Sequence, residues 1–173
     1  MNNYFIIEDG IGLRSIQKED RTAFLFWHNN SDMRDMIGGI FPFTENTFRE
    51  ICASGNENYP SDMWFAICVN NELAGIAGFH SIKYIQRNAE LALFIGEQNN
   101  RNKGIGSKTL KLLEEYAFNT LNLHRLYVNV YSDNLIAHKF FQKNQWQEEG
   151  ILREASYWKN CFRNVVIYAK LNN

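Results

Sequence analysis

Apolar and polar positions follow two different periods along this chain, and the periods predict both strands and helices. In some segments apolar residues alternate with polar ones or form short unbroken runs, as in β-strands. In others they recur every three or four positions, as on one face of an α-helix. We predict strands at residues 10–16, 63–70, 72–82, 89–95, 125–131, 146–158 and 161–171. We predict helices from residue 18 to the segment 28–32, from Thr44 to about Ser54 and Gly55, and over residues 104–121 and 135–144.

The predicted connections determine how these strands pair. Asn70 and Asn71 form a tight turn, because Asn tolerates positive φ, so the flanking strands make an antiparallel hairpin. A second hairpin closes the chain around Lys159 and Asn160. The strand–helix–strand segment over residues 89–131 instead favours a parallel crossover. The predicted fold is a single domain, residues 1–173, of the α+β (mixed α/β) class, with a mixed, mostly antiparallel sheet of about seven strands and about four helices.

A short polar loop with two glycines, Gly104 and Gly106, separates the fourth predicted strand from the helix that follows it. The first turn of a helix has unpaired N–H groups and a partial positive charge, and glycines let the backbone approach an anion closely. Arg101, Lys103 and Lys108 add positive charge at the same place. The loop therefore predicts a binding site for phosphate groups.

Three kinds of phosphate loop compete for this segment. A Walker loop requires Gly followed directly by Lys, but Ser107 separates Gly106 from Lys108. A dinucleotide fingerprint requires a third glycine where this chain has Thr109. The remaining pattern is Arg-x-x-Gly-x-Gly, which begins at Arg101. An ordinary helix start could share this hexapeptide, so a second motif is needed to distinguish the two.

That second motif lies in the next predicted helix, at Asn134, Ala137, Phe141 and Trp146. Together the two motifs resemble those of the GNAT superfamily of acyl-CoA N-acyltransferases. The aromatic segment that begins at Tyr157, with the final strand, is similar to the RimJ/RimL-like branch, which includes ribosomal-protein N-terminal acetyltransferases. The ending departs from that branch, because Cys161 stands where a glycine is usual after Asn160.

The resemblance implies a sheet that splays open between the strands at 89–95 and 125–131, with acetyl-CoA (coenzyme A) bound in the split. Splayed strands leave backbone groups unpaired, and the amides of the pantetheine arm can pair with them. Asn134 could also be a plain helix N-cap, and Lys143 a solvated lysine. The residues expected to bind the cofactor are Leu93, Phe94, Ile95, Arg101, Asn102, Lys103, Gly104, Ile105, Gly106, Ser107, Asn134, Phe141 and Lys143.

The same resemblance implies direct attack of a neutral amine on the thioester, which requires a base for the amine and a proton for the departing sulfur. Glu90 is the expected general base, with His80 as a second candidate. Many relatives carry a tyrosine acid where this chain has Phe141, which cannot donate a proton. Ser132 or Tyr131 could replace it. A thiol with a pKa of ~8.5 also leaves without full protonation.

The range of possible acceptors is narrowed by the free energy needed to remove a proton from the acceptor amine. An α-amino group has a pKa of ~8 and a lysine-like amine ~10.4, a difference of about 3 kcal/mol at neutral pH. One modest base suits the easier amine, so the favoured acceptor is a protein or peptide N-terminus. An amino sugar or other small amine, a polyamine, and an inactive acyl-CoA-binding protein remain alternatives. Relatives place acceptor residues at Trp27, His28, Asn29, Arg34, Tyr157 and Trp158.

Composition and charge restrict the other partners. The formal net charge is −1, from 18 basic and 19 acidic residues, which disfavours nucleic acid as a partner. Cys52, Cys68 and Cys161 form no Cys-x-x-Cys pair, and the four histidines lack ligand spacing, so we expect no metal site.

No apolar run is long enough to span a membrane, and we expect a cytoplasmic protein. The closing hairpin would allow a homodimer.

Overall fold

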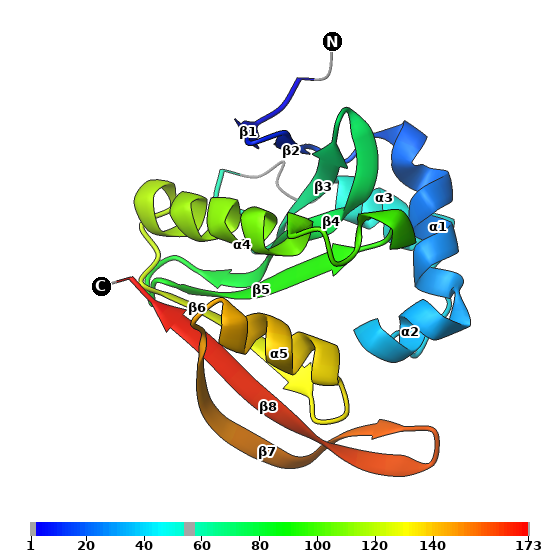
Figure 1. The fold of residues 1–173 in the computed structure, drawn as a ribbon, viewed down its shortest axis with the longest axis vertical. Coiled ribbons are helices and arrows are strands. Elements are labelled where there is room, and N and C mark those ends of the chain that lie inside the picture. The colour runs from blue at the N-terminus through cyan, green and yellow to red at the C-terminus, as the bar shows by residue number, and fades with distance from the viewer. Residues whose placement is uncertain (1–2, 54–57, 173) are drawn as a thin grey trace.

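The computed structural model describes residues 3–53 and 58–172, which form one twisted sheet of eight strands in the order β1-β2-β3-β4-β5-β6-β8-β7 (Figure 1). All neighbouring strands pair antiparallel except β5 and β6, which pair parallel. The strands are β1 (Ile6–Glu8), β2 (Ile11–Arg14), β3 (Met63–Val69), β4 (Glu72–Lys83), β5 (Asn88–Ile95), β6 (Arg125–Tyr131), β7 (Gln147–Trp158) and β8 (Cys161–Leu171).

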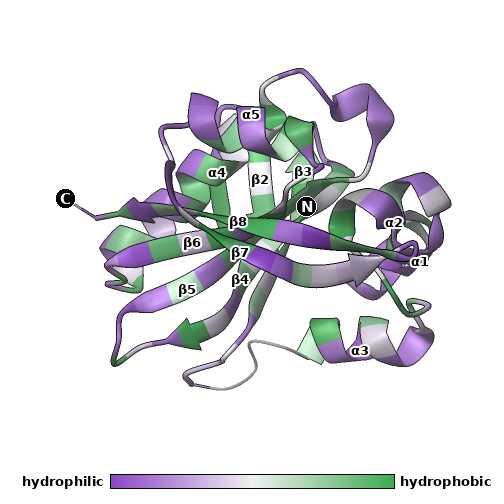
Figure 2. Ribbon diagram, turned by 90° about the horizontal axis from the view of Figure 1, so that it is seen from below, coloured by the Kyte–Doolittle hydropathy of each residue, from purple (hydrophilic) through white to green (hydrophobic). Residues whose placement is uncertain are grey.

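Helices cover both faces of this sheet. Figure 2, which looks along the sheet, places α4 and α5 on one side and α3 on the other, with α1 and α2 at one end. We call these two sides the α4–α5 face and the α3 face. The α-helices are α1 (Arg21–Asn29), α2 (Ser31–Ile37), α3 (Glu45–Ala53), α4 (Ile105–Glu115) and α5 (Leu135–Lys143).

Each face has its own apolar core. On the α4–α5 face, Leu110 and Leu113 of α4 pack with Leu91 of β5 and Leu126 of β6. Their spacing on α4 is the three-residue spacing typical of one helical face. On the α3 face a smaller core gathers around Phe48 of α3 and the aromatic side chains of α1. The strands shared by both cores are therefore held from both sides.

The feature that matters most for function is the short pairing between β5 and β6. Only residues 88–90 of β5 pair with residues 125–127 of β6, and the last pair is Glu90 with Tyr127. Beyond it the two strands diverge, as the ribbon of Figure 1 shows. One edge of residues 91–95 is consequently left without a partner strand among the described residues, so the predicted mixed, splayed sheet is confirmed.

Both predicted hairpins are present with the expected turn geometry. Asn70 and Asn71 have φ of 51° and 69°, and Lys159 and Asn160 have φ of 49° and 63°. Positive φ at both central residues gives a turn whose twist matches that of the flanking strands. The turns could be predicted because their chemistry is local.

The N-terminal third differs from prediction in two respects. The strand predicted at 10–16 is shorter, and a further strand, β1, pairs with it around Asp9 and Gly10. The segment 28–32 was expected only to end a helix, but Asn30 begins another: its side chain accepts hydrogen bonds from the Asp32 and Met33 N–H groups and caps α2. The predicted end of the third helix, at Ser54 and Gly55, lies outside the described residues.

Candidate active site

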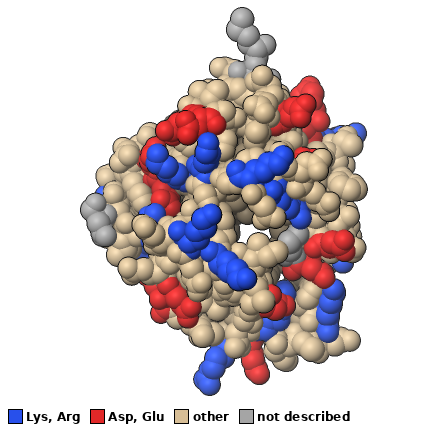
Figure 3. Space-filling model, in the orientation of Figure 1, with Lys and Arg blue, Asp and Glu red and all other residues tan. Residues whose placement is uncertain are grey.

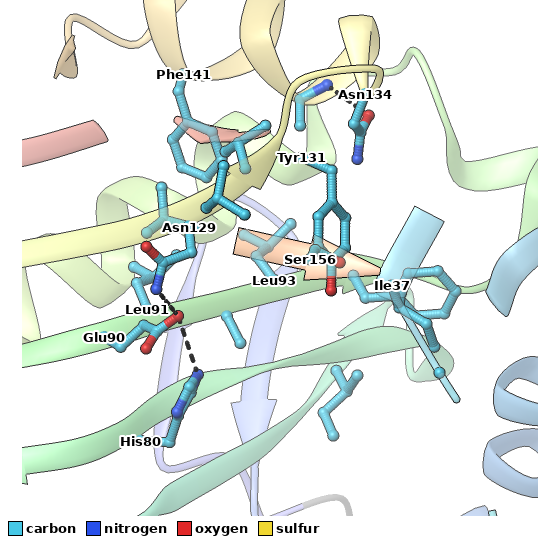
Figure 4. A pocket seen from close by; sticks show the side chains of 18 of the residues that line it. Ile37, His80, Glu90, Leu91, Leu93, Asn129, Tyr131, Asn134, Phe141 and Ser156 are labelled. Carbon is cyan, nitrogen blue, oxygen red and sulfur yellow. Dashed lines mark hydrogen bonds and ion pairs between the residues drawn. The ribbon is translucent and has the colours of Figure 1, made fainter. Parts of the chain in front are cut away.

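The split between β5 and β6 forms a cleft of about 730 Å³. Its walls are residues 90–94 of β5 and residues 128–131 of β6, the stretches beyond the last strand pair. Figure 4 shows the side chains of both strands converging on this space, with Phe141 and Asn134 on one side and His80 and Glu90 on the other. The cleft therefore opens toward both faces of the sheet.

Alternation along the strands assigns each side chain to a face. Leu91 and Leu93 of β5 point to the α4–α5 face and join its core, whereas Glu90 and Phe94 point to the α3 face. Ala137 of α5 adds to the first group. The cleft is lined on the α3 face by His28, Ile51, Trp64, Ile76 and His80. A ligand in the split would thus meet two chemically different walls.

The glycine loop leads into the N-terminus of α4, as predicted. Gly104 is the N-cap residue with φ of 78°, a left-handed conformation that favours glycine, and no side chain caps this helix. The first backbone hydrogen bond of the turn runs from the Lys108 N–H to the Gly104 carbonyl. In the described chain the N–H groups of residues 105–107 therefore have no backbone or side-chain acceptor, which suits an anion.

Gly106 is required for a different reason. A Cβ at this position would lie 3.2 Å from Cε2 of Phe140 on α5, closer than normal packing allows without movement. The missing side chain lets the first turn of α4 approach α5 closely. The two helices flank the α4–α5 side of the split in Figure 1.

Positive side chains surround this helix start, but Arg101 has a partner already. Its guanidinium donates hydrogen bonds to the carbonyls of Ile95 and Gly96, at 3.1 and 3.3 Å, and so fixes the loop to the end of β5. Asn102, with φ of 59°, and Lys103 are exposed in the same loop. Figure 3 shows Lys and Arg side chains gathered around a hollow on this face.

Two further predicted cofactor residues line a smaller hollow bordered by α4 and the end of α5. Ser107 and Lys143 border this space of about 270 Å³, together with Lys111 and Lys170. Lys170 pairs with Glu114 at 2.9 Å, so part of that charge is neutralised. Ile105, by contrast, is buried in the core below the loop.

Asn134 and Phe141 both line the cleft from the α5 side. The Asn134 side chain accepts a hydrogen bond from the Ala137 N–H at 3.1 Å, so it is the N-cap that the sequence analysis left as an alternative. Phe141 is only 6% exposed and packs on Trp146 and Tyr168. Its ring shapes the cleft wall and has no proton to give.

The polar cluster at the closed end of the split is built from three strands. Glu90 and His80 are directly opposite each other on β5 and β4, and their Oε1 and Nε2 atoms are 3.8 Å apart. Asn129 of β6 donates a hydrogen bond from Nδ2 to Glu90 Oε1 at 2.8 Å. The His80 ring also stacks on Trp64. Glu90 and His80 could be proposed from the sequence, but Asn129 could not, because its approach to Glu90 depends on the register between β5 and β6.

His28 lies in the cleft on the α3 face and is the predicted acceptor residue that lines it. Its Nδ1–H donates to the Phe24 carbonyl at 2.9 Å, which places the lone pair of the neutral ring on Nε2. The ring stacks on Phe43 at 4.2 Å between centroids. Burial lowers the pKa of His28, since it disfavours the charged form, so the ring is neutral at neutral pH.

The structure does not bring Trp27, Asn29 and Arg34 into the cleft lining. Trp27 is 1% exposed and packs on Phe94 and against Gly96, so it supports the end of β5 from behind. Asn29 hydrogen-bonds to both backbone groups of Phe43, which holds the ring that stacks on His28. Trp27 and Asn29 therefore support the site from outside the cleft lining, and a direct acceptor contact of the three residues stays a prediction.

Tyr157 and Trp158 lie further out on β7, where Tyr157 packs on Phe162. Instead, Leu152, Ala155 and Ser156 of the same strand line the cleft. The cause is an irregularity in the β7–β8 ladder between Leu152 and Ser156, with Glu154 at a positive φ of 51°. Such a bulge changes which residues face inward, and simple alternation could not predict it.

Of the two candidate proton donors, Tyr131 is in the cleft and Ser132 is not. Ser132 is exposed in the turn after β6, where its N–H donates to the Asn164 carbonyl. The Tyr131 hydroxyl reaches across the split to α2, because a Cβ on Gly38 would lie 2.1 Å from it. The Arg163 guanidinium stacks on the Tyr131 ring at 3.8 Å.

Among the described residues, no group of three His, Cys, Asp or Glu side chains is arranged to hold a metal ion. In the same residues, no helix has the length and apolarity that a membrane crossing requires.

Comparison with known proteins adds an independent observation. A family model described as an acetyltransferase (GNAT) domain matches residues 11–147. The uncharacterised N-acetyltransferase YoaA of Bacillus subtilis is 34% identical over 57% of this chain and 55% of its own length. Spermidine N(1)-acetyltransferase of Vibrio cholerae is 25% identical over 88% of both chains, and ribosomal-protein-serine acetyltransferase of Escherichia coli is 25% identical over 62% of this chain and 59% of its own length. The chain thus spans little more than half of some relatives that it matches.

Two solved structures have the same fold. Spermidine N-acetyltransferase from Vibrio cholerae, in complex with CoA and spermine, gives a TM-score of 0.84 at 22% identity over 95% of this chain and 96% of that one. RimL, a ribosomal L7/L12 α-N-protein acetyltransferase in complex with coenzyme A, gives 0.83 at 19% identity over 98% of both chains. At these identities the likeness concerns the fold alone.

Proposed function

The chain belongs to the GNAT acetyltransferase family, and we propose that it transfers an acetyl group from acetyl-CoA to a primary amine, with residues 1–173 acting as one domain. The observation that carries this proposal is the placement of two features on one split. An uncapped helix N-terminus stands on its α4–α5 side, and a carboxylate, Glu90, stands on its α3 side. A donor could therefore enter from one face of the sheet and an acceptor from the other.

Acetyl-CoA fits the α4–α5 face of the cleft. Its pyrophosphate would accept hydrogen bonds from the free N–H groups of residues 105–107, at the positive end of the helix. The amides of its pantetheine arm would pair with the open edge of residues 91–95. Arg101 holds the loop to β5 and so fixes the distance between these two sites.

The reaction needs three actions from this chain. Glu90 removes a proton from the amine, directly or through a water, and the amine nitrogen then bonds to the acetyl carbon as the carbon–sulfur bond breaks. A backbone N–H near Phe94 or Ile95 stabilises the charge that develops on the carbonyl oxygen. The sulfur leaves as a thiolate or takes a proton from Tyr131, which is better placed than Ser132.

The α3 face supports a singly charged amine with an apolar neighbour as the acceptor. Among the described residues that line the cleft, Glu90 is the sole carboxylate, and Ile37, Ile51 and Ile76 contribute apolar surface. A second ammonium group would lose its hydration there without gaining a counter-ion. We infer that the acceptor is a protein or peptide N-terminal α-amino group, whose pKa of ~8 also suits one modest base.

Two alternative functions remain testable. Spermidine and ribosomal-protein acetyltransferases both occur among the relatives, so similarity does not choose between a polyamine and an N-terminus. The absence of a tyrosine at Phe141 is the feature that favours an inactive acyl-CoA-binding protein. A thiol-release assay with acetyl-CoA separates the three functions.

The assay would compare a short peptide with a free N-terminus, the same peptide with a blocked N-terminus and a free lysine, glucosamine, and spermidine. We expect the free N-terminal peptide to give the highest kcat/KM. Faster release with spermidine would overturn the acceptor assignment and leave the acetyltransferase assignment intact. No release with any amine, despite saturable acetyl-CoA binding, would identify an inactive binding protein.

A further inference from the structure

We infer that Asn129 is a positioning residue for the general base. Its side-chain amide holds the Glu90 carboxylate in the orientation and charge state that proton removal requires. The inference rests on the proposed acetyl transfer, but it concerns a residue of β6 that neither sequence motif contains. Its basis is the geometry at the closed end of the split.

Asn129 joins the two strands just where their backbone ladder stops. The last backbone pair is Glu90 with Tyr127, and two residues further along β6 the Asn129 side chain returns to Glu90 at 2.8 Å. In the part of the chain that the structure describes, no other group donates a hydrogen bond to the Glu90 carboxylate. His80 approaches the same oxygen only to 3.8 Å, beyond hydrogen-bonding distance.

This contact leaves the other carboxylate oxygen available. Asn129 binds Oε1, and no described residue donates to Oε2, so the second oxygen can take the proton of the amine or of an intervening water. An amide is neutral at every working pH, so it stabilises the carboxylate without competing for protons. A histidine or lysine in its place would change charge or neutralise the base.

Two titratable groups face Glu90 from the neighbouring strands, His80 of β4 and Tyr127 of β6. Burial raises the pKa of Tyr127, and the nearby Glu90 charge adds to this, so the phenol stays neutral in the working range. The His80 Nε2 atom approaches Glu90 Oε1 only to 3.8 Å, which makes a weak contact. Removing Asn129 would therefore leave Glu90 with a weak histidine contact and no direct donor.

The surroundings of Asn129 distinguish a role in the reaction from a role in folding. Its side chain is exposed within the cleft and makes this one side-chain hydrogen bond in the described structure. The Glu90 side chain keeps 20% exposure, so losing this donor should lower stability only modestly and leave the fold intact. The effect should appear in the pH dependence of the reaction instead.

The experiment measures thiol release against pH for wild type, N129L, N129D and E90Q, with N119D as the matched control. Asn119 is an exposed asparagine in the π-helical segment Tyr116–Thr120 that continues α4, and it does not line the cleft. N129L removes the donor. N129D keeps the shape of the side chain but places a second carboxylate beside the first. All variants are checked for a cooperative unfolding transition and an unchanged KM for acetyl-CoA.

We expect the acid limb of kcat/KM to move upward by about one pH unit in N129L, because a hydrogen bond to a charged group is of that size. The shift should be larger in N129D and absent in N119D. An acid limb that stays in place in both Asn129 variants would overturn the inference while the wild-type activity still supports the proposed function. If wild type releases no thiol with any amine, the proposed function and the role of Asn129 are both contradicted.

Discussion

The two faces of the cleft differ in how their residues are brought together. On the α4–α5 face the anion site is a continuous stretch, residues 101–107, and its geometry follows from local conformation. On the α3 face the polar cluster joins Glu90, His80 and Asn129 from three strands. The first site is built by a loop and a helix start, and the second by strand register. Local and long-range construction should therefore respond differently to mutation.

The largest expected difference concerns Glu90. The E90Q substitution removes the base from the α3 face and should lower kcat/KM for the amine by about 10²–10⁴-fold, the usual contribution of a positioned general base. Acetyl-CoA affinity should stay the same, because the donor binds the opposite face. Steady-state thiol release and calorimetric titration check the two quantities. A similar loss of both would show that the two faces are not independent.

A carboxylate can be added to the α3 side of the cleft, where a polyamine acceptor would need a second counter-ion. Ile37 of α2 lines the cleft, and the I37E substitution places a second negative charge on the α3 side. We expect kcat/KM for spermidine, relative to an N-terminal peptide, to rise about tenfold, equivalent to about 1.4 kcal/mol. The matched control is I151E, at an exposed isoleucine of β7 that does not line the cleft. Equal changes in both variants would argue for a general charge effect.

Acetyl-CoA binding at the anion site can be weakened by straining the backbone at Gly104. Gly104 has φ of 78° and open space around the Cβ position, so the G104A substitution would strain only the backbone. We expect a loss of about 1 kcal/mol of unfolding free energy and a few-fold weaker acetyl-CoA binding. Gly150 also has open space but no positive φ, and G150A should change neither quantity. Denaturant unfolding and titration measure both.

The smallest effect concerns the pH dependence of stability. Burial lowers the pKa of His28, so the unfolded chain binds a proton more readily than the folded one. The contribution of the neutral His28 ring to folding stability is fully present above the ordinary histidine pKa of ~6.5. It is lost as the pH falls through the lower pKa that His28 has in the folded chain. The H28Q substitution should flatten the fall of the melting temperature below that pH. An unchanged pH profile would mean that His28 is not the group responsible.

The contrast between local and long-range construction also explains which features of the fold and the site could be predicted from the sequence. The hairpin turns at Asn70 and Lys159 and the glycine loop depend on residues close together in the chain, and each was predicted. Asn134 has the N-cap role that its position before a helix allowed. Local chemistry was sufficient for these features.

Prediction was poorer wherever a distant contact determines the position. The cleft-lining residues Asn129, Trp64 and Ser156 were missed, because their positions depend on strand register or on the bulge in β7. Trp27 was predicted to contact the acceptor, but its ring is buried behind β5. An aromatic residue on an amphipathic helix carries no local signal that separates a core position from a pocket position.

The measurement that tests the account most directly is thermal unfolding of wild type and E90Q with and without acetyl-CoA. A ligand at about 100 times its Kd adds about 2.7 kcal/mol to the unfolding free energy, which raises the melting temperature by several degrees. The account predicts the same shift in both proteins, and none with ATP or NAD. No shift with acetyl-CoA would contradict the assignment of the glycine loop. A shift in wild type that is lost in E90Q would contradict the separation of the two faces.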